Sequence, residues 1–185
     1  MPGKVILIRH AHPLVSHDRP SEWELSPQGR EAASALAGLA FWREVGVLYC
    51  SPERKAVQTA EPISARWRTP IYILEDLREV VRPREAKDYE AKLGAFLAGS
   101  PPPGWEGAEG AASRILETID ILSSQMEGDV GVVSHGIILT LFLAKMQDAK
   151  PSVELHRSIG FGDHAIFDPR SRKIIREFTG EAMIG

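Results

Sequence analysis

Two histidines and two arginines lie close to the ends of short apolar runs in this sequence. Arg9-His10 follows the first run, Arg54 comes shortly after the second, and His135-Gly136 follows a later one. A neutral imidazole can attack phosphorus, and guanidinium N–H groups match phosphoryl oxygens bidentately. Clustered cations also repel one another unless an anion relieves them. These residue types therefore indicate a site for a phosphoryl group.

The elements that must bring these residues together are predicted from apolar periodicity. Continuous β-branched and leucine runs are typical of buried strands, and apolar residues every three or four positions are typical of helices. We expect strands at 5–8, 47–50, 71–74 and 130–133, helices beginning near 27, 53, 86, 112 and 137, and a final hairpin within 165–178. Pro62 predicts a kink or an early break in the second helix.

Strands that alternate with helices favour an α/β fold, a three-layer α/β/α sandwich with a mostly parallel central sheet. In such sheets the carboxyl ends of the strands meet at a crevice where ligands bind. Arg9-His10, Arg54 and His135 are therefore expected to share one site. The chain of 185 residues is predicted to form one domain spanning 1–185.

Composition excludes several classes of protein. Hydrophobic residues make up 43% and charged residues 25%, which excludes a disordered or fibrous chain, and a single cysteine excludes a disulfide framework. The net charge of -3 and the lack of a long basic tract argue against nucleic acid or an anionic membrane as partner. No targeting or membrane-spanning segment is recognised, so we expect a cytoplasmic protein.

Six blocks, five of them polar signatures, occur in an order that is similar to that of one known family. The blocks are Arg9-His-Ala11, Leu25-Ser-Pro-Gln-Gly29, Ser51-Pro-Glu-Arg54 continuing to Thr59-Ala60, Leu77-Arg-Glu79, Gly107-Ala-Glu109 and Val132-Val-Ser-His135-Gly136. Together they resemble the histidine phosphatase superfamily, also called phosphoglycerate mutase-like. The resemblance implies a phosphoglycerate mutase-like fold, with a short cap segment around 80–107.

The resemblance also implies a role for each matched residue. His10 corresponds to the nucleophile and Glu79 to the general acid, which later acts as the base that activates water; His135 is counted with the catalytic groups. The phosphate-binding residues would be Arg9, Arg54, His135, Ser16 and Gly136. No metal and no other cofactor is implied, because arginines supply the positive charge that a metal ion supplies elsewhere.

Several positions leave alternatives open. Ala11 stands where the family has glycine, and alanine would be strained there if the backbone needs a positive φ. Glu75 and Asp76 are neighbouring carboxylates that could replace Glu79 as the acid. Ser16 stands where asparagine is usual, and Pro13 where threonine or glutamate is frequent. The other histidines match no motif and are expected on the surface: His12, His17, His156 and His164.

A basic cluster of Arg82, Arg84 and Lys87 follows the expected acid. Such a cluster is either a solvated helix start or a contact for an extra anionic group on the substrate, and the sequence does not decide between them.

The sequence predicts a phosphatase that hydrolyses phosphomonoesters, or phosphorylated protein side chains, through a phosphohistidine on His10. Its partner would be a small phosphorylated substrate or a phosphoprotein. The alternatives are a phosphoglycerate mutase-type phosphoryl transfer, a non-catalytic module that binds phosphorylated ligands, and a metal hydrolase. Hydrolysis is favoured over mutase chemistry because the segment 80–107 is short for a cover that keeps water out. The physiological substrate and the oligomeric state stay open.

Overall fold

A six-stranded sheet forms the centre of the computed structural model, which describes residues 3–83, 88–125 and 127–180. The strands are β1 (Val5–Arg9), β2 (Val45–Cys50), β3 (Ile71–Ile73), β4 (Asp129–Ser134), β5 (His164–Asp168) and β6 (Lys173–Arg176). Their order is β3-β2-β4-β1-β5-β6. The first four are mutually parallel, whereas β5 pairs antiparallel with β1 and with β6. The predicted mostly parallel sheet is confirmed.

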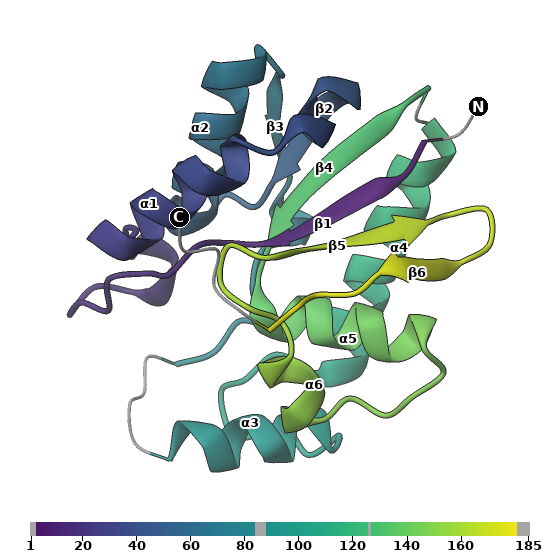
Figure 1. Ribbon diagram of the computed structural model, residues 1–185. Coiled ribbons are helices and arrows are strands. Elements are labelled where there is room, and N and C mark those ends of the chain that lie inside the picture. Colours follow the sequence, from purple (N-terminus) through teal and green to yellow (C-terminus); the bar gives the residue numbers. More distant parts are fainter. Residues whose placement is uncertain (1–2, 84–87, 126, 181–185) are drawn as a thin grey trace.

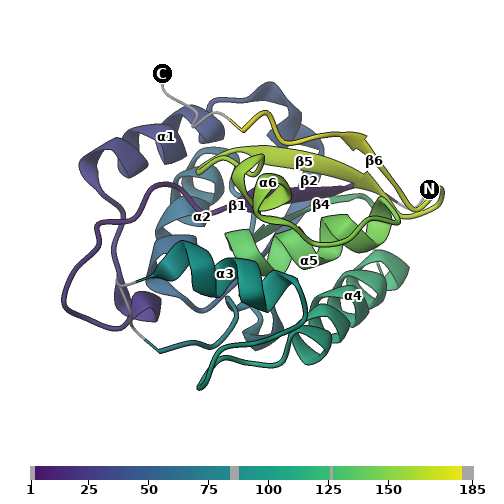
Figure 2. The same ribbon diagram turned by 90° about the horizontal axis from the view of Figure 1, so that it is seen from below.

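Helices cover both faces of this sheet (Figure 1). One face carries α1 (Pro27–Ala37) and α2 (Arg54–Trp67), and the other carries α4 (Ala108–Gln125) and α5 (Gly136–Met146). The short helices α3 (Tyr89–Leu97) and α6 (Val153–Arg157) lie on the α5 side (Figure 2). Three 3-10 turns complete the described elements: η1 (Pro20–Glu22), η2 (Ala40–Glu44) and η3 (Glu75–Leu77). The three-layer α/β/α sandwich is therefore confirmed.

The apolar run of β1 is buried on both faces because successive side chains of a strand point to opposite sides. Val5 and Leu7 pack in the cluster that contains α4 and α5, and Ile6 and Ile8 pack in the cluster that contains α1 and α2. The first nine residues of α5 are all buried, since this helix lies between the sheet and its neighbouring helices. The core therefore fixes β1, β4 and α5, the elements that His10 and His135 directly adjoin.

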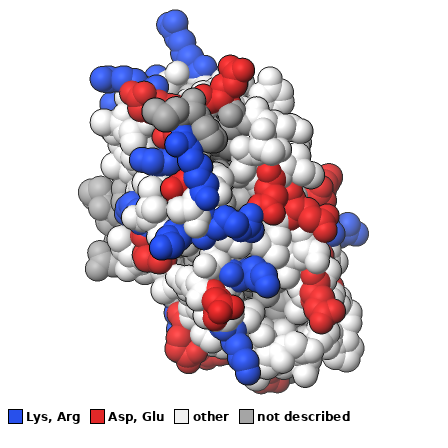
Figure 3. Space-filling view, turned by 90° about the vertical axis from the view of Figure 1, so that its right-hand side faces the viewer, with Lys and Arg blue, Asp and Glu red and all other residues white. Residues whose placement is uncertain are grey.

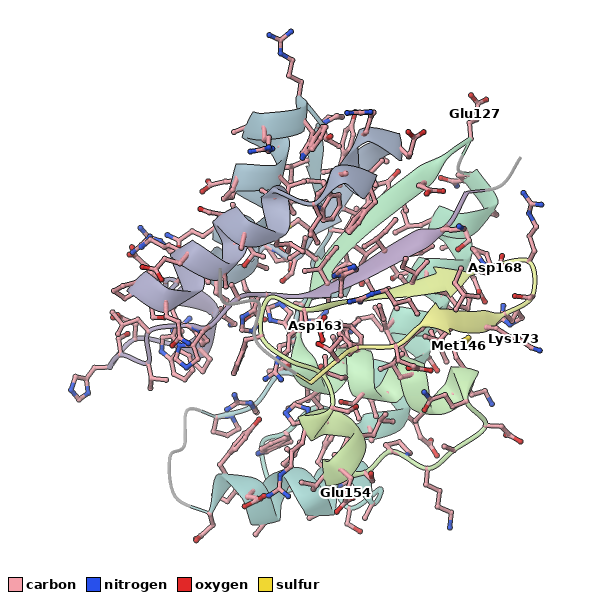
Figure 4. All side chains as sticks on the ribbon, viewed as in Figure 1. Glu127, Met146, Glu154, Asp163, Asp168 and Lys173 are labelled. Atoms are coloured by element: carbon pink, nitrogen blue, oxygen red, sulfur yellow. The ribbon has the colours of Figure 1, made fainter. Side chains whose placement is uncertain are left out.

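A buried carboxylate fixes the far end of the chain beside β1. Asp163, labelled in Figure 4, lies just before β5, and its backbone carbonyl accepts the Arg9 N–H at 3.2 Å. Its side chain accepts the backbone N–H groups of Thr179 at 2.5 Å and Gly180 at 3.2 Å. The last described residues are thereby held beside β1, the strand that His10 follows.

Most predicted elements are present, with some differences. The second helix does not break at Pro62: α2 continues to Trp67, so the expected early break is wrong. The helix expected from 86 begins at Tyr89, and residues 84–87 lie outside the described part of the chain. Helix α6 and the 3-10 turns were not predicted, because elements of three to five residues show no apolar period.

The surface carries charges of both signs. In Figure 3, Lys and Arg side chains intermingle with Asp and Glu side chains over one face of the molecule. Among the described helices, none is long and apolar enough to cross a membrane.

Candidate active site

The carboxyl ends of β1, β2 and β4 meet at one edge of the sheet. Arg9 pairs with Ser134, and Cys50 pairs with Val133, so the residues that follow these strands are neighbours. A cavity of about 1040 Å³ opens at this edge. The residues that line it include Arg9, His10, Lys55, Glu79, His156 and Phe161. The structure thus brings the first histidine and the expected acid to one cavity.

His10 is buried just after the end of β1, and one of its ring nitrogens is hydrogen-bonded. Its Nδ1 lies 2.8 Å from the carbonyl oxygen of Ala11, which can only accept a hydrogen bond. Nδ1 therefore carries the proton, and Nε2 keeps its lone pair. Burial, followed by the proximity of His135 and Lys55, holds the pKa of His10 well below its usual value. The imidazole is neutral near pH 7, as a nucleophile must be.

Arg9 is held rigidly beside this histidine. One guanidinium N–H donates to the Ile159 carbonyl at 2.5 Å, and the guanidinium lies 3.8 Å from the centre of the Phe161 ring. Its Nε is buried with no hydrogen-bond partner among the described residues. Gly136 lies close by, because a Cβ there would come within 2.9 Å of the guanidinium carbon. The side chain is therefore positioned before any anion arrives.

His135 follows β4 and is fully buried, and neither it nor Gly136 is among the residues that line the cavity. Its ring centre lies 5.0 Å from that of His10, and its Nε2 lies 2.7 Å from Ser51 Oγ at the end of β2. The other nitrogen, Nδ1, is buried and has no partner in the described residues. Burial, with a further contribution from Lys55 and Arg9, holds the pKa of His135 well below its usual value.

Glu79 reaches the same place from the segment after η3. Its carboxylate accepts the N–H groups of Ile137 and Ile138 in the first turn of α5, both at 3.0 Å. It also accepts the N–H of Val80 at 3.0 Å. Burial is the larger influence and raises the pKa of Glu79 above its usual value. Of the two alternative acids, Glu75 also lines the cavity but is exposed, and Asp76 is exposed and does not line it.

The second guanidinium expected at the site, that of Arg54, is not there. Its side chain is 60% exposed, pairs with Glu24 at 2.5 Å and does not line the cavity. The neighbouring residue Lys55 is buried and lines the cavity instead. Its ammonium donates to the Pro20 carbonyl at 2.7 Å and forms an ion pair with Glu53. The structure thus places a lysine where an arginine was predicted.

Helical periodicity explains this difference and could have predicted it. Residues four apart share one face of a helix, so Lys55 lies on the same face as Thr59. Thr59 is fully buried and accepts the N–H of Ala11, next to the nucleophile, at 2.9 Å. Arg54 begins α2 one position earlier and points away from this contact.

Glu53 is a buried carboxylate that the sequence reasoning missed. Besides pairing with Lys55, it accepts the N–H of Glu79 at 2.8 Å and lies 3.6 Å from Nε2 of His135. It therefore joins the cation, the candidate acid and the second histidine. Its only signal in the sequence is its place directly after Ser51-Pro52.

A comparison with protein families shows to which family this chain belongs. The profile of the histidine phosphatase superfamily (branch 1) matches residues 5–161, a range that contains every site residue described above. The chain belongs to the histidine phosphatase superfamily. A search of curated proteins found no match.

Solved structures of this superfamily are similar over almost the whole chain. Bacillus stearothermophilus YhfR superposes with a TM-score of 0.81 at 21% identity and covers 97% of each chain. The α-ribazole phosphatase of Shigella flexneri gives 0.76 at 21% identity and covers 98% of each chain. A phosphoserine phosphatase mutant of Entamoeba histolytica in complex with phosphoserine gives 0.75 at 19% identity, over 96% of this chain and 98% of that one. At these identities the similarity establishes the fold, and the family match supports a phosphatase function.

The structure also shows the backbone conformation or the place of four residues named in the sequence analysis. Ala11 is not among the residues with positive φ, so alanine is not strained there. Ser16 does not line the cavity, and its hydroxyl donates to Asp18 at 2.7 Å. His156 and His164 are buried, so placing them on the surface was wrong.

His156 is an unpredicted residue of the cavity. It lines the wall beside Arg9, and its Nδ1 lies 3.2 Å from the hydroxyl of Thr140 in α5. It lies on α6, a helix too short for the sequence to signal. His12 also lines the cavity but is exposed, whereas His17 is exposed outside it.

Proposed function

We propose that this protein is a metal-independent phosphatase that hydrolyses phosphomonoesters through a phosphohistidine on Nε2 of His10. The observation that carries the proposal is the hydrogen bond between His10 Nδ1 and the Ala11 carbonyl, which leaves Nε2 unprotonated beside Arg9 and His135. A free imidazole lone pair next to a fixed guanidinium is what attack on a phosphoryl group requires.

In the first step Nε2 of His10 attacks phosphorus and forms an N–P bond, while the bond from phosphorus to the alcohol oxygen breaks. Glu79 donates its proton to that leaving oxygen. Its raised pKa supports this role, because an acid must hold its proton until the leaving group needs it. Arg9, Lys55 and His135 would contact the phosphoryl oxygens, and the backbone N–H of Gly136 at the start of α5 would add a further donor.

In the second step a water molecule attacks phosphorus and the N–P bond breaks, which frees Nε2. Glu79 takes the proton of that water and is ready for the next cycle. The products are an alcohol and inorganic phosphate. Arg9 and Lys55 would neutralise the charge of the phosphoryl group, so the proposed reaction needs no metal ion. Among the described residues, no cluster of three or more His, Cys, Asp or Glu side chains could hold one.

The test is release of inorganic phosphate from 4-nitrophenyl phosphate by the purified protein. We expect phosphate and nitrophenol in equal amounts, with a rate that a chelator does not reduce. Loss of activity on chelation would contradict metal independence. Turnover that depends on a bisphosphate primer and releases no phosphate would show a mutase, and tight phosphate-ester binding without turnover would show a binding module.

A further inference from the structure

Glu53 is a buried carboxylate whose side chain does not cap the helix that it begins. It is the N-cap residue of α2, yet its side chain makes no capping hydrogen bond. The residue is only 8% exposed, and it lines the cavity. An N-cap side chain normally accepts an N–H of its own helix, so the oxygens of Glu53 have other partners for another reason.

The two oxygens contact the cation and the acid of the proposed reaction. Oε2 forms an ion pair with the ammonium of Lys55. Oε1 accepts the backbone N–H of Glu79 at 2.8 Å and lies 3.6 Å from Nε2 of His135. Glu53 therefore joins residues of α2, of the segment after η3 and of the end of β4.

Stability alone does not account for this buried ion pair. Removing two charges from water costs much of what their attraction returns, and apolar side chains in their place are often as stable. The pair does fix the position of a flexible side chain. The Lys55 ammonium is held by Glu53 and by the Pro20 carbonyl, which accepts at 2.7 Å. The charge of Lys55 is thereby kept at one place in the wall of the cavity.

The same carboxylate acts on Glu79. The carboxylate of Glu79 is held by the N–H groups of Ile137 and Ile138, and its main chain is held by Glu53. Burial is the larger influence that raises the pKa of Glu79, and the negative charge of Glu53 adds to it, against the positive charge of Arg82. Glu53 therefore fixes the backbone of the acid and favours its protonated form.

We propose that Glu53 is a positioning residue of the phosphatase reaction: one oxygen holds the ammonium of Lys55 and the other holds the backbone of Glu79, so that the cation and the acid keep a fixed spacing around the phosphoryl group. This inference rests on the proposed function, because it takes the phosphoryl group to lie at His10 and Glu79 to be the acid. In this role Glu53 itself transfers no proton.

The link to Lys55 is measured with a double-mutant cycle on kcat/KM for 4-nitrophenyl phosphate. Glu53→Gln keeps an oxygen for the Glu79 N–H but removes the charge that holds the ammonium. We expect it to reduce kcat/KM by at least about fivefold in the wild type and by less than about twofold in Lys55→Met, because a contact that is already absent cannot be lost again. A gain in activity in the wild type would show that Glu53 only repels the anion, and would overturn the inference.

The link to Glu79 is measured by comparing 4-nitrophenyl phosphate with phenyl phosphate. Phenol is a weaker acid than nitrophenol, so its oxygen depends more on a proton from Glu79 as it leaves. In Glu53→Met, which loses both contacts, we expect kcat/KM to fall at least about fivefold further for phenyl phosphate than for 4-nitrophenyl phosphate. A loss of folded protein would reduce both values by the same factor. Glu79→Gln is the reference and should show the same difference between the substrates.

Glu24→Met is the matched control. Glu24 also pairs with a cation in the first turn of α2, Arg54, but its side chain is 40% exposed and does not line the cavity. We expect kcat/KM to change by less than about twofold for both substrates, since an exposed ion pair contributes little.

The outcomes separate this inference from the proposed function. If Glu79→Gln distinguishes the two substrates and Glu53→Met does not, or if the losses of Glu53→Gln and Lys55→Met simply multiply, Glu53 is not a positioning residue and the proposed function stands. If Glu79→Gln does not distinguish them either, Glu79 is not the acid, and the proposed mechanism fails together with this inference. Should Glu53→Met not fold, the cycle with Glu53→Gln decides alone.

Discussion

The cation that lines the cavity from α2 is a lysine, and its neighbour in sequence is an exposed arginine. Lys55 is a point charge fixed by Glu53 and by the Pro20 carbonyl, whereas Arg54 is paired with Glu24 at the surface. A lysine offers no bidentate fork, so it neutralises charge without fixing the orientation of the phosphoryl oxygens. Arg9, which is stacked on Phe161, would orient these oxygens instead.

This arrangement predicts that two adjacent substitutions differ greatly in their effect on kcat/KM. Lys55→Met should reduce kcat/KM for an aryl phosphate by at least about a hundredfold, because removing one preorganised charge from a transition state costs roughly this much. Arg54→Met should change it by less than about threefold, since an exposed ion pair contributes little. Steady-state measurements of kcat/KM for both variants test this prediction. A larger loss in Arg54→Met than in Lys55→Met would contradict the assignment.

Among the elements, the first turn of α5 organises the site. Its N–H groups hold Glu79, and its first residue, Gly136, makes room for Arg9 and His156. A carboxylate and an expected phosphate dianion both favour this end of the helix, where the dipole is positive. Nine buried residues anchor α5 in the core, so its position is set by packing and not by the ligand.

Gly136→Ala should therefore displace side chains inside the site. The added Cβ would lie 2.6 Å from His156 and 2.9 Å from Arg9, so both side chains must shift. We expect a loss of at least about tenfold in kcat/KM and a destabilisation of roughly 1–3 kcal/mol from overpacking.

The control is Gly110→Ala in α4, where an added Cβ meets nothing within 4 Å. Alanine there should raise stability by up to about 1 kcal/mol and leave kinetics unchanged, because it favours the helix. Denaturant unfolding and kinetics of both variants test this. Full activity in Gly136→Ala would contradict the close packing proposed for Arg9.

How far the sequence predicts the molecule differs between its parts. The parallel strands and the histidines at their ends were predicted, since long buried runs leave a clear period. Lys55, Glu53 and His156 were not, because their roles depend on which side of a helix faces the cavity and on a helix of five residues. Contacts such as that of Arg82 with Tyr89 join residues whose proximity no local pattern encodes.

For the molecule as a whole, buried histidines predict loss of stability in acid. Burial lowers the pKa of both His156 and His164 from 6.5 to about 4. Between these values the unfolded chain binds more protons than the folded one, so the free energy of unfolding falls as pH drops from about 6.5 to about 4. Each histidine contributes on the order of 3 kcal/mol to this fall.

Denaturant unfolding between pH 7 and pH 4 measures the effect. The variant His164→Asn removes one titrating group, so its stability should depend less steeply on pH than that of the wild type. A loss of stability that is the same at every pH does not change the slope of stability against pH. The comparison of slopes is therefore independent of such a loss in the variant. Equal slopes in the two proteins would contradict a buried neutral His164.

The most direct test of the proposed mechanism is a search for phosphate bound covalently to His10 during turnover. The protein is mixed with ³²P-labelled aryl phosphate, quenched in alkali after milliseconds and digested for peptide analysis. We expect label that is stable in alkali and labile in acid, located on the peptide that contains His10, and absent from His10→Ala. Turnover without such label, or turnover that persists in His10→Ala, would contradict a phosphohistidine intermediate on this residue.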